Sequence, residues 1–222
     1  MSELKVNKIS PRDGTAFTLG DSGDTFTVPA GANIVNSGTA TGFGGGAWTM
    51  ISTTEISNSA SLTITGITAT YSVYGLFWSN LHPSISGAEL RFRVGDANGI
   101  DSGSTDYRGA SLGNHSNNGQ AVSNTNTQEL SYVRVDGIPV NGMGADAGQG
   151  ASGHMYIYHP RSSNLDAHFQ GQSMHIGNDE VGYHNSFWAH RRAVIALDRV
   201  NFYLSTGQLE QGRFTLYGIS HA

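Results

Sequence analysis

Residues 193–222, which read AVIALDRVNFYLSTGQLEQGRFTLYGISHA, carry the clearest strand pattern in the chain. Two apolar runs, residues 194–204 and 212–219, are rich in the β-branched and aromatic residues that favour strands. The polar segment 205–208 contains a glycine and separates the two runs. Because two β-rich runs joined by such a break are typical of an antiparallel strand pair, we expect the chain to end in one. The last run is so apolar that we expect it to be an inner strand of its sheet.

The overall composition is that of a chain with many turns and short strands. Glycine accounts for 30 of the 222 residues and charged residues for 13%, whereas the usual shares are roughly 7% and about 25%. Hydrophobic residues make up 37% of the chain and recur in strand-like runs, which argues against a disordered protein. No window shows a sustained helical period. We therefore predict an all-β protein in which residues 46–222 form an antiparallel β-sandwich of the jelly-roll-like kind.

Charge and hydrophobicity exclude several classes of partner. The formal net charge is −5 and the 12 Lys and Arg residues are scattered, so we expect no nucleic-acid partner. No apolar run approaches the roughly 20 residues that a membrane span needs, so we expect no membrane insertion. Residues 1–10 lack the apolar core of a signal peptide, which predicts synthesis in a cytoplasm without a secretion signal. The chain contains no cysteine and therefore no disulfide.

Residues 1–45 differ from the rest of the chain. Short apolar alternations are separated by the turn-forming residues 20–24 and 29–31, and a glycine-rich linker follows at residues 36–46. Strands this short need a partner surface, or copies of themselves, to bury their apolar side chains. We therefore predict an extended N-terminal arm that becomes ordered on assembly. A disordered tail is the alternative.

Parts of the chain resemble proteins of bacteriophage particles. Residues 4–44, LKVNKISPRDGTAFTLGDSGDTFTVPAGANIVNSGTATGFG, resemble the leader of tail-fibre-like and other virion structural proteins, especially those of phages of marine bacteria. The segment GRFTLYGI, residues 212–219, resembles the closing strand common in the same group, and residues 62–93 also fit it. The match is weakest over residues 95–153.

The resemblance implies a virion structural protein that forms a homotrimer. It implies that residues 1–45 attach to other tail or capsid proteins of the virion, or wind with their own copies. The protein would be assembled in the cytoplasm of the host bacterium and would then reside in the virion.

The strand pattern continues after the linker. We expect strands at residues 48–51, 61–67, 71–81, 89–94, 130–135 and 154–159, with a hairpin partner for the last at residues 164–176. Long loops are expected at residues 95–128, 137–153 and 177–188. Loops of this length in compact domains are usually functional or mobile, so we expect the binding function to lie in residues 95–128 and 177–188.

Sequence motifs for catalysis are accidental or indecisive. Residues 20–23, GDSG, copy the nucleophile motif of trypsin-like proteases, but no histidine precedes them to act as the base. Residues 148–153 fit GxGxxG, but a strand pattern follows where dinucleotide binding needs a helix. A carboxylate pair for glycoside cleavage cannot be chosen, because the separation of the two groups depends on the fold. The carboxylates available for such a pair include Glu55, Glu89, Asp136 and Asp179.

No catalytic residue, metal site or cofactor is predicted. Asp96, Asn98 and Asp101 supply oxygens, but the calcium-loop pattern fails because Asp101 occupies its glycine position. The nine histidines lack a spacing that would place two imidazoles together on one strand or helix face. We expect them to be exposed loop residues rather than zinc ligands.

Six residues are candidate contacts with a host receptor: Tyr107, Arg108, His115, Asn117, Tyr183 and His184. They occur in the two long polar loops, and aromatic side chains supply large contact areas and stack on sugar faces. Packing in the core or at a subunit interface is the alternative for Tyr183 and His184, and the sequence leaves both readings open. For Phe187 and Trp188 we favour packing in the core or at a subunit interface.

These observations predict a non-enzymatic virion protein, a tail-fibre or appendage subunit that contributes to host attachment through a surface glycan or an outer-membrane receptor. One alternative is a capsid decoration or tail-connector protein with no receptor role. Another is a glycan depolymerase, although the chain lacks the repeats of the large parallel β-helix that usually carries this activity.

Overall fold

A computed structural model describes residues 21–25, 27–32, 47–116, 121–135 and 142–220. The chain divides into two compact units, Met1–Gly44 and Gly45–Ala222. The described part of the first unit holds two tight turns, in which the amides of Asp24 and Ala32 donate to the carbonyls of Asp21 and Pro29. The rest of the expected arm lies outside the described residues.

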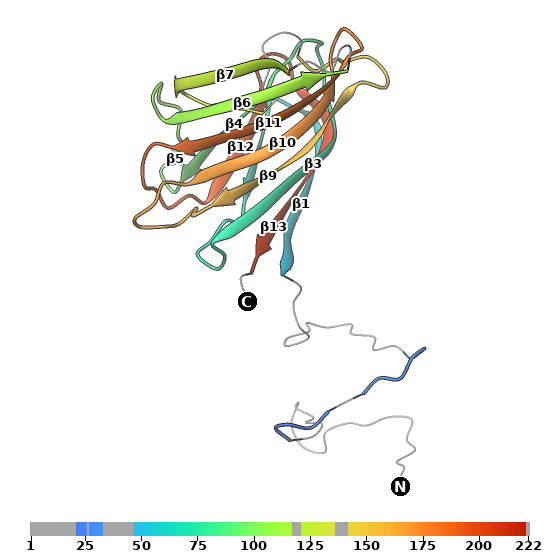
Figure 1. Ribbon diagram of the computed structural model, residues 1–222, viewed down its shortest axis with the longest axis vertical. Coiled ribbons are helices and arrows are strands. Elements are labelled where there is room, and N and C mark those ends of the chain that lie inside the picture. The colour runs from blue at the N-terminus through green and yellow to red at the C-terminus, as the bar shows by residue number, and fades with distance from the viewer. Residues whose placement is uncertain (1–20, 26, 33–46, 117–120, 136–141, 221–222) are drawn as a thin grey trace. The chain divides into compact units, whose positions relative to one another are not determined.

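The second unit is a sandwich of two antiparallel sheets, and its described residues contain no helix (Figure 1), so the all-β prediction is confirmed. The wide sheet has eight strands in the order β1-β13-β3-β9-β10-β11-β6-β7. Their bounds are β1 (Trp48–Ser59), β3 (Val73–Pro83), β6 (Tyr107–His115), β7 (Ala121–Leu130), β9 (Gly150–Tyr158), β10 (His168–Ile176), β11 (Gly182–Arg191) and β13 (Leu209–Ile219). The described residues thus contain no helix long and apolar enough to cross a membrane.

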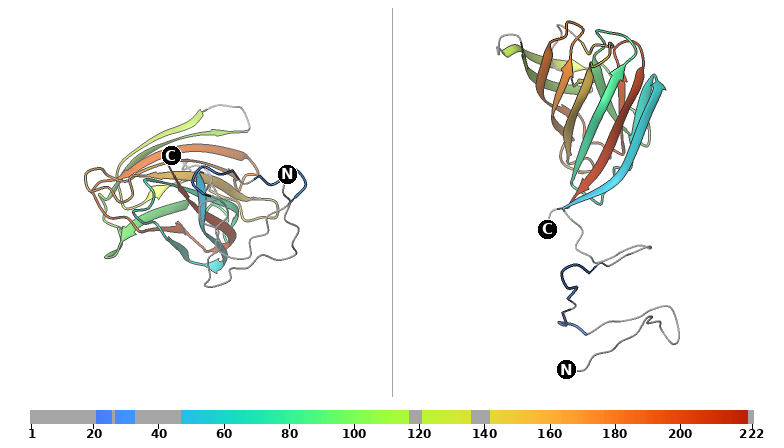
Figure 2. Two further views of the ribbon diagram at one scale, coloured as in Figure 1. Left: turned by 90° about the horizontal axis from the view of Figure 1, so that it is seen from below. Right: turned by 90° about the vertical axis from the view of Figure 1, so that its right-hand side faces the viewer.

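The narrow sheet packs behind the wide one in Figure 1, and Figure 2 shows the same two layers from other sides. Its order is β2-β12-β4-β5, and a further short strand, β8, also pairs with β4. The bounds are β2 (Ser61–Thr65), β4 (Leu90–Asp96), β5 (Gly99–Ile100), β8 (Val133–Arg134) and β12 (Arg199–Leu204).

The core lies between the two sheets and is dominated by aromatic rings. Phe202 of β12 packs on Phe214 of β13 with ring centroids 4.7 Å apart, and Phe92 of β4 packs on Phe169 of β10 at 5.2 Å. All four side chains are buried, as strict alternation along their strands requires. Each of these pairs joins a narrow-sheet strand to a wide-sheet strand, so burial of apolar area holds the layers together.

The predicted pairing of the two C-terminal runs is wrong. β12 pairs with β2 and β4, whereas β13 pairs with β1 and β3 in the other sheet. The segment between them crosses from one sheet to the other instead of closing a hairpin. The physical reason is that both strands have a fully apolar inward side. Both of these sides are buried when the two strands pack against each other across the core. The prediction that the last strand is an inner one is confirmed, because β13 lies between β1 and β3.

Two of the predicted loops are largely strands. Residues 95–128 include β5, β6 and most of β7, and residues 177–188 include most of β11. In β6 the inward-facing positions include Gly109 and Gly113, which pair with Ala189 and Asn185 of β11. Small residues at inward positions erase the apolar alternation by which a strand is recognised in a sequence. Outward-facing aromatic residues hide it in β11.

Several strand ends also differ from the prediction. β1 runs on to Ser59 instead of ending at residue 51, β8 covers only Val133–Arg134, and β9 begins inside the predicted loop 137–153. The first C-terminal run becomes a strand only at Arg199. The hairpin of β9 and β10 is confirmed, with Tyr158 opposite His168 and Gly150 opposite Ile176.

Candidate ligand-binding face

The surface of the wide sheet that points away from the narrow sheet is hollowed and rich in polar and aromatic side chains. We call it the outer face. Along β10, Phe169, Ser173 and His175 point into the sandwich and are buried, while Gln170, Gln172 and Met174 alternate with them and are exposed. The register carries this alternation to neighbouring strands, so outward residues form rows across the sheet. Two such rows are Tyr156–Gln170–Trp188 and Ser152–Met174–His184.

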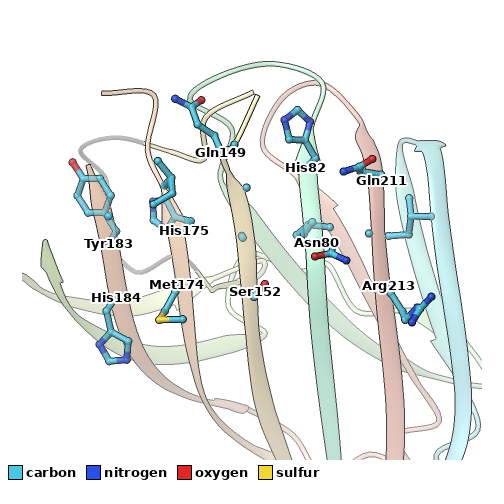
Figure 3. Close-up of a pocket in the computed structure, with 18 of the residues that line it drawn as sticks. Asn80, His82, Gln149, Ser152, Met174, His175, Tyr183, His184, Gln211 and Arg213 are labelled. Carbon is cyan, nitrogen blue, oxygen red and sulfur yellow. The ribbon is translucent and has the colours of Figure 1, made fainter. Parts of the chain in front are cut away.

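A groove of about 910 Å³ crosses one end of the outer face. Figure 3 shows its labelled side chains rising from β11, β10, β9, β3 and β13, which lie side by side. Most of these side chains are polar hydrogen-bonding groups: Asn80, His82, Gln149, Ser152, His184 and Gln211. Asn80 lies on this wall because β3 has an irregular register between Trp78 and Leu81, where Asn80 takes a left-handed φ of 54°.

The one carboxylate and the one guanidinium among the described lining residues of this first groove are bound to each other. Nε of Arg213 lies 3.2 Å from Oε1 of Glu55 on the neighbouring strand β1. Nδ1 of His82 lies 2.8 Å from Oε2 of Glu210. Of the described residues that line the groove, Glu55 alone carries a carboxylate. The groove therefore presents hydrogen-bond donors and acceptors with little net charge.

A second groove, of about 480 Å³, lies next to the first over β6, β11, β10 and β9. Trp188, which is 54% exposed, and Leu112 line one part of it, and Tyr156 and Tyr158 line another. The polar side chains of the lining are Ser111, His154, Gln170, Gln172 and Ser186. Because Gln172 lines the second groove and Met174, two residues further on, lines the first, the grooves are only about 7 Å apart along β10.

No protein-family model, curated protein or solved structure matches this chain. The interpretation of the outer face therefore rests on its own chemistry. A sugar ring offers hydroxyl groups around its rim and apolar C–H groups on its faces. Amide side chains both donate and accept hydrogen bonds, and indole and phenol rings offer flat apolar surfaces with a polar edge. Adjoining grooves that combine the two suit an uncharged, polyhydroxylated chain.

Tyr107, predicted to contact a receptor, is instead a core residue. Its side chain is fully buried, and its hydroxyl accepts a bond from the Val94 amide at 2.8 Å and donates to the Asp101 carbonyl at 2.9 Å. Burial raises the pKa of this phenol above its ordinary value. The hydroxyl thus connects β6 of the wide sheet to β4 of the narrow one. Tyr107 of β6 points inward because it pairs with Arg191, which belongs to the inward-facing residues of β11.

The structure brings together three of the other predicted contact residues. His115, Tyr183 and His184 all line the first groove, with the rings of His115 and Tyr183 6.0 Å apart. Tyr183 is buried and stacks on His175 at 5.0 Å, so it shapes the end of the groove more than it offers surface. Arg108 is exposed on β6 but lines neither groove. Asn117 lies outside the described residues.

For Phe187 and Trp188 the sequence favoured packing in the core or at a subunit interface, and the structure separates the two residues. Phe187 lies in the core, as expected, but its neighbour Trp188 does not, since it points outward from β11. Gln170, Gln172 and Tyr156 were missed altogether. The alternation HFQGQSM in residues 168–174 is the signal that would have found the two glutamines.

Most of the described histidines are strand residues, so for these the prediction that they occupy exposed loops is wrong. Five stand on the three central strands of the wide sheet: His154, His168, His175, His184 and His190. Among the described residues, no group of three or more His, Asp or Glu side chains is placed to hold a metal ion. Asp101 binds Arg191 at 2.7 Å, and Asp96 accepts the Asn98 amide at 2.8 Å.

Proposed function

We propose that this protein is a bacteriophage virion protein, a tail-fibre or appendage subunit, whose sandwich domain binds a glycan of the host surface. One observation carries the binding role: two adjoining grooves on an outer sheet face, lined by hydrogen-bonding side chains and exposed aromatic rings. The resemblance of residues 4–44 and 212–219 to phage virion proteins supports the assignment to a particle.

The chemistry of the grooves favours many modest contacts over one deep pocket. The amides of Gln170 and Gln172 can each donate to one sugar hydroxyl and accept from another. Trp188 and Tyr156 flank Gln170 in the same row and offer flat surfaces to sugar rings. Binding by one domain would be weak, and several copies on one particle would multiply it through avidity.

Cleavage of the glycan is the less favoured role. Glycoside hydrolysis usually needs two carboxyl groups about 5 to 9.5 Å apart. In the described lining of the first groove, the one carboxylate is that of Glu55, and it is bound to Arg213. Elsewhere, Glu89 is bound to Arg91 and Arg134, and Asp179 accepts the Tyr183 hydroxyl at 2.8 Å. Asp136 lies outside the described residues.

A polysaccharide array tests the binding role. The array carries purified bacterial lipopolysaccharides and capsular polysaccharides together with dextran, laminarin and mannan, and the full chain is applied to it. We expect binding to at least one uncharged polysaccharide, and a roughly tenfold or greater loss for Trp188→Ala, because tryptophan is enriched among the residues that dominate binding energy. Tyr132→Ala removes an aromatic ring that lies just before β8 and packs on Arg91 of the narrow sheet. It is the matched control and should bind normally.

Other results of the same experiment decide between the rival roles. If the folded protein binds nothing on the array, the decoration or connector role is favoured and glycan attachment is wrong. Release of reducing sugar from a bound polysaccharide would instead identify a depolymerase.

The assignment to a virion is tested separately. We expect light scattering to give three times the 23.5 kDa chain mass, and a monomer at micromolar concentration would contradict the trimer. We also expect that deletion of residues 1–45 leaves a folded domain that no longer joins phage particles. Immunogold electron microscopy would show whether the truncated chain is present on particles. If it is, the arm is not the anchor.

A further inference from the structure

A tryptophan outside both grooves lies on a place in the sheet that is shaped to receive it. Trp48, at the start of β1, is 41% exposed. A Cβ atom at Gly75 of β3 would lie only 2.7 Å from Cζ3 of its indole and 3.2 Å from Cη2. Real Cβ atoms do not approach other atoms this closely. The missing side chain of Gly75 is therefore what lets the indole rest against the backbone of the sheet.

Neighbouring rings hold the indole in this position. The centroids of Phe77, Tyr156 and Tyr217 lie 5.8, 6.0 and 5.8 Å from that of Trp48. The two tyrosine rings meet it nearly edge-on, at 69°. An aromatic ring fixed in this way loses little conformational freedom when something stacks on its exposed surface. We call Trp48 and Gly75 the platform.

The platform is in line with the second groove. The register places Gly75, Tyr156, Gln170 and Trp188 directly opposite one another on β3, β9, β10 and β11. This row runs perpendicular to the strands and spans three strand spacings, about 14 Å. An indole thus lies at each end of the row, with a phenol and an amide between them. Tyr156 belongs both to the ring cluster and to the lining of the second groove.

The polar surroundings of the platform match those of the grooves. The hydroxyls of Thr53 and Thr215, one from each of β1 and β13, lie 3.2 Å apart on the same face. Beyond them stands the Glu55–Arg213 pair of the first groove. No side chain of the row from Gly75 to Trp188 carries a fixed charge. These neighbours suit a neutral sugar better than a charged ligand.

We infer that Trp48 is a stacking subsite for one sugar residue of an uncharged polysaccharide, whose chain runs across the strands to Trp188. This rests on the proposed glycan-binding function and adds the direction, the length and the second anchor of the bound chain. The ligand is then a polymer segment of several sugar residues, because no single sugar reaches both indoles.

The test applies single variants of the full chain to the same array of lipopolysaccharides, capsular polysaccharides, dextran, laminarin and mannan. Trp48→Ala should weaken binding of the polysaccharide that the wild type binds about tenfold. The monosaccharides of that polysaccharide, added as competitors, should inhibit the wild type and the variant equally well. Gly75→Ala should reproduce the loss, because the added methyl group displaces the indole. Val194→Ala removes an exposed apolar side chain that lies outside the strands and should bind as the wild type does.

The outcomes separate the inference from the function on which it rests. If Trp188→Ala loses binding and Trp48→Ala keeps it, the platform is not a subsite and the glycan-binding function stands. If the wild type binds nothing, both are wrong. If Trp48→Ala lowers the light-scattering mass, Trp48 is a contact between copies of the chain and the inference is overturned. Thermal unfolding of Gly75→Ala shows whether this variant has a folding defect. If it has one, the result for Trp48→Ala alone decides whether the platform is a subsite.

Discussion

The polar and aromatic side chains on the two outer faces of the sandwich differ in whether they contact each other. On the narrow sheet these groups bind each other: Arg91 lies 4.2 Å from the ring centroid of Tyr132, Arg93 lies 4.8 Å from that of Tyr203, and Glu89 contacts both Arg91 and Arg134. On the wide sheet the large apolar side chains remain exposed. They are Trp48, Met50, Leu112, Met174 and Trp188. Among the residues whose burial is described, which leaves out residues 121–129, every other exposed large apolar side chain lies outside the strands.

The difference separates a surface that stabilises the fold from one that is available to a partner. Burial works against the charge of Arg91, but the hydrogen bond and the charge of Glu89 outweigh it and raise the pKa of Arg91 above its ordinary value. That guanidinium is therefore engaged within the chain. A contiguous surface of exposed apolar and hydrogen-bonding groups is, in contrast, a usual mark of an interaction site. On this comparison, stability should depend on the interior and the narrow face, and binding on the wide face.

The largest expected effect on stability concerns the interior hydroxyl that joins the sheets. Tyr107→Phe should lower the free energy of unfolding by about 1 to 3 kcal/mol, because it leaves the buried Val94 amide and Asp101 carbonyl without their partner. Denaturant titration measures the loss. Tyr158 is a half-buried residue of the outer face, and Tyr158→Phe should change stability by less than about 0.5 kcal/mol. An equal loss in both variants would mean that the Tyr107 hydroxyl does not connect the layers.

The same residue predicts an alkaline dependence of stability. Because burial raises the pKa of Tyr107 in the folded chain, the folded chain keeps a proton that the unfolded chain loses near pH 10. Stability should therefore fall as the pH rises above about 10, with the full contribution present below that pH. Tyr107→Phe should flatten this slope in unfolding experiments between neutral and strongly alkaline pH. An unchanged slope would show that other groups cause it.

A smaller effect is expected from breaking the ion pair on the narrow face. Arg91→Ala removes the contact with Tyr132 and one of the two arginines bound to Glu89, and should cost about 1 kcal/mol. Arg213→Ala is the matched substitution on the wide face, where the Glu55–Arg213 pair is more exposed, and it should cost less than about 0.5 kcal/mol. The comparison between the faces fails if the two variants lose the same stability.

The sequence predicted the class of fold better than the order of its strands. The alternation in residues 89–94 and 154–159 was sufficient to recognise strands and the β9–β10 hairpin. The partner of a strand is not encoded in its own alternation, since an inward apolar face can be buried beside a neighbour or opposite one. That is why the two C-terminal runs were paired in one sheet although they face each other from opposite sheets.

The outer face of the wide sheet was hidden in the sequence for a related reason. A strand is recognised by apolar residues on its inner side and polar ones on its outer side. In β11 the outward Trp188 breaks this rule, and in β6 the inward Gly109 and Gly113 break it, so both strands resembled loops. Placement of His115, Tyr183 and His184 on one groove depended on the register of β6 and β11, which no local pattern determines.

The smallest expected effect on stability is also the one that separates the faces most sharply. Met174 is 59% exposed at the junction of the two grooves, so Met174→Ser should change the free energy of unfolding by less than about 0.5 kcal/mol. The variant still alters the floor that a bound chain would cross, and binding on the polysaccharide array should weaken. A loss of stability above about 1 kcal/mol, or one that grows on dilution, would mean that Met174 is buried between copies of the chain. The outer face would then be an assembly interface, because mass action couples folding to association only where the substituted surface is buried in the assembly.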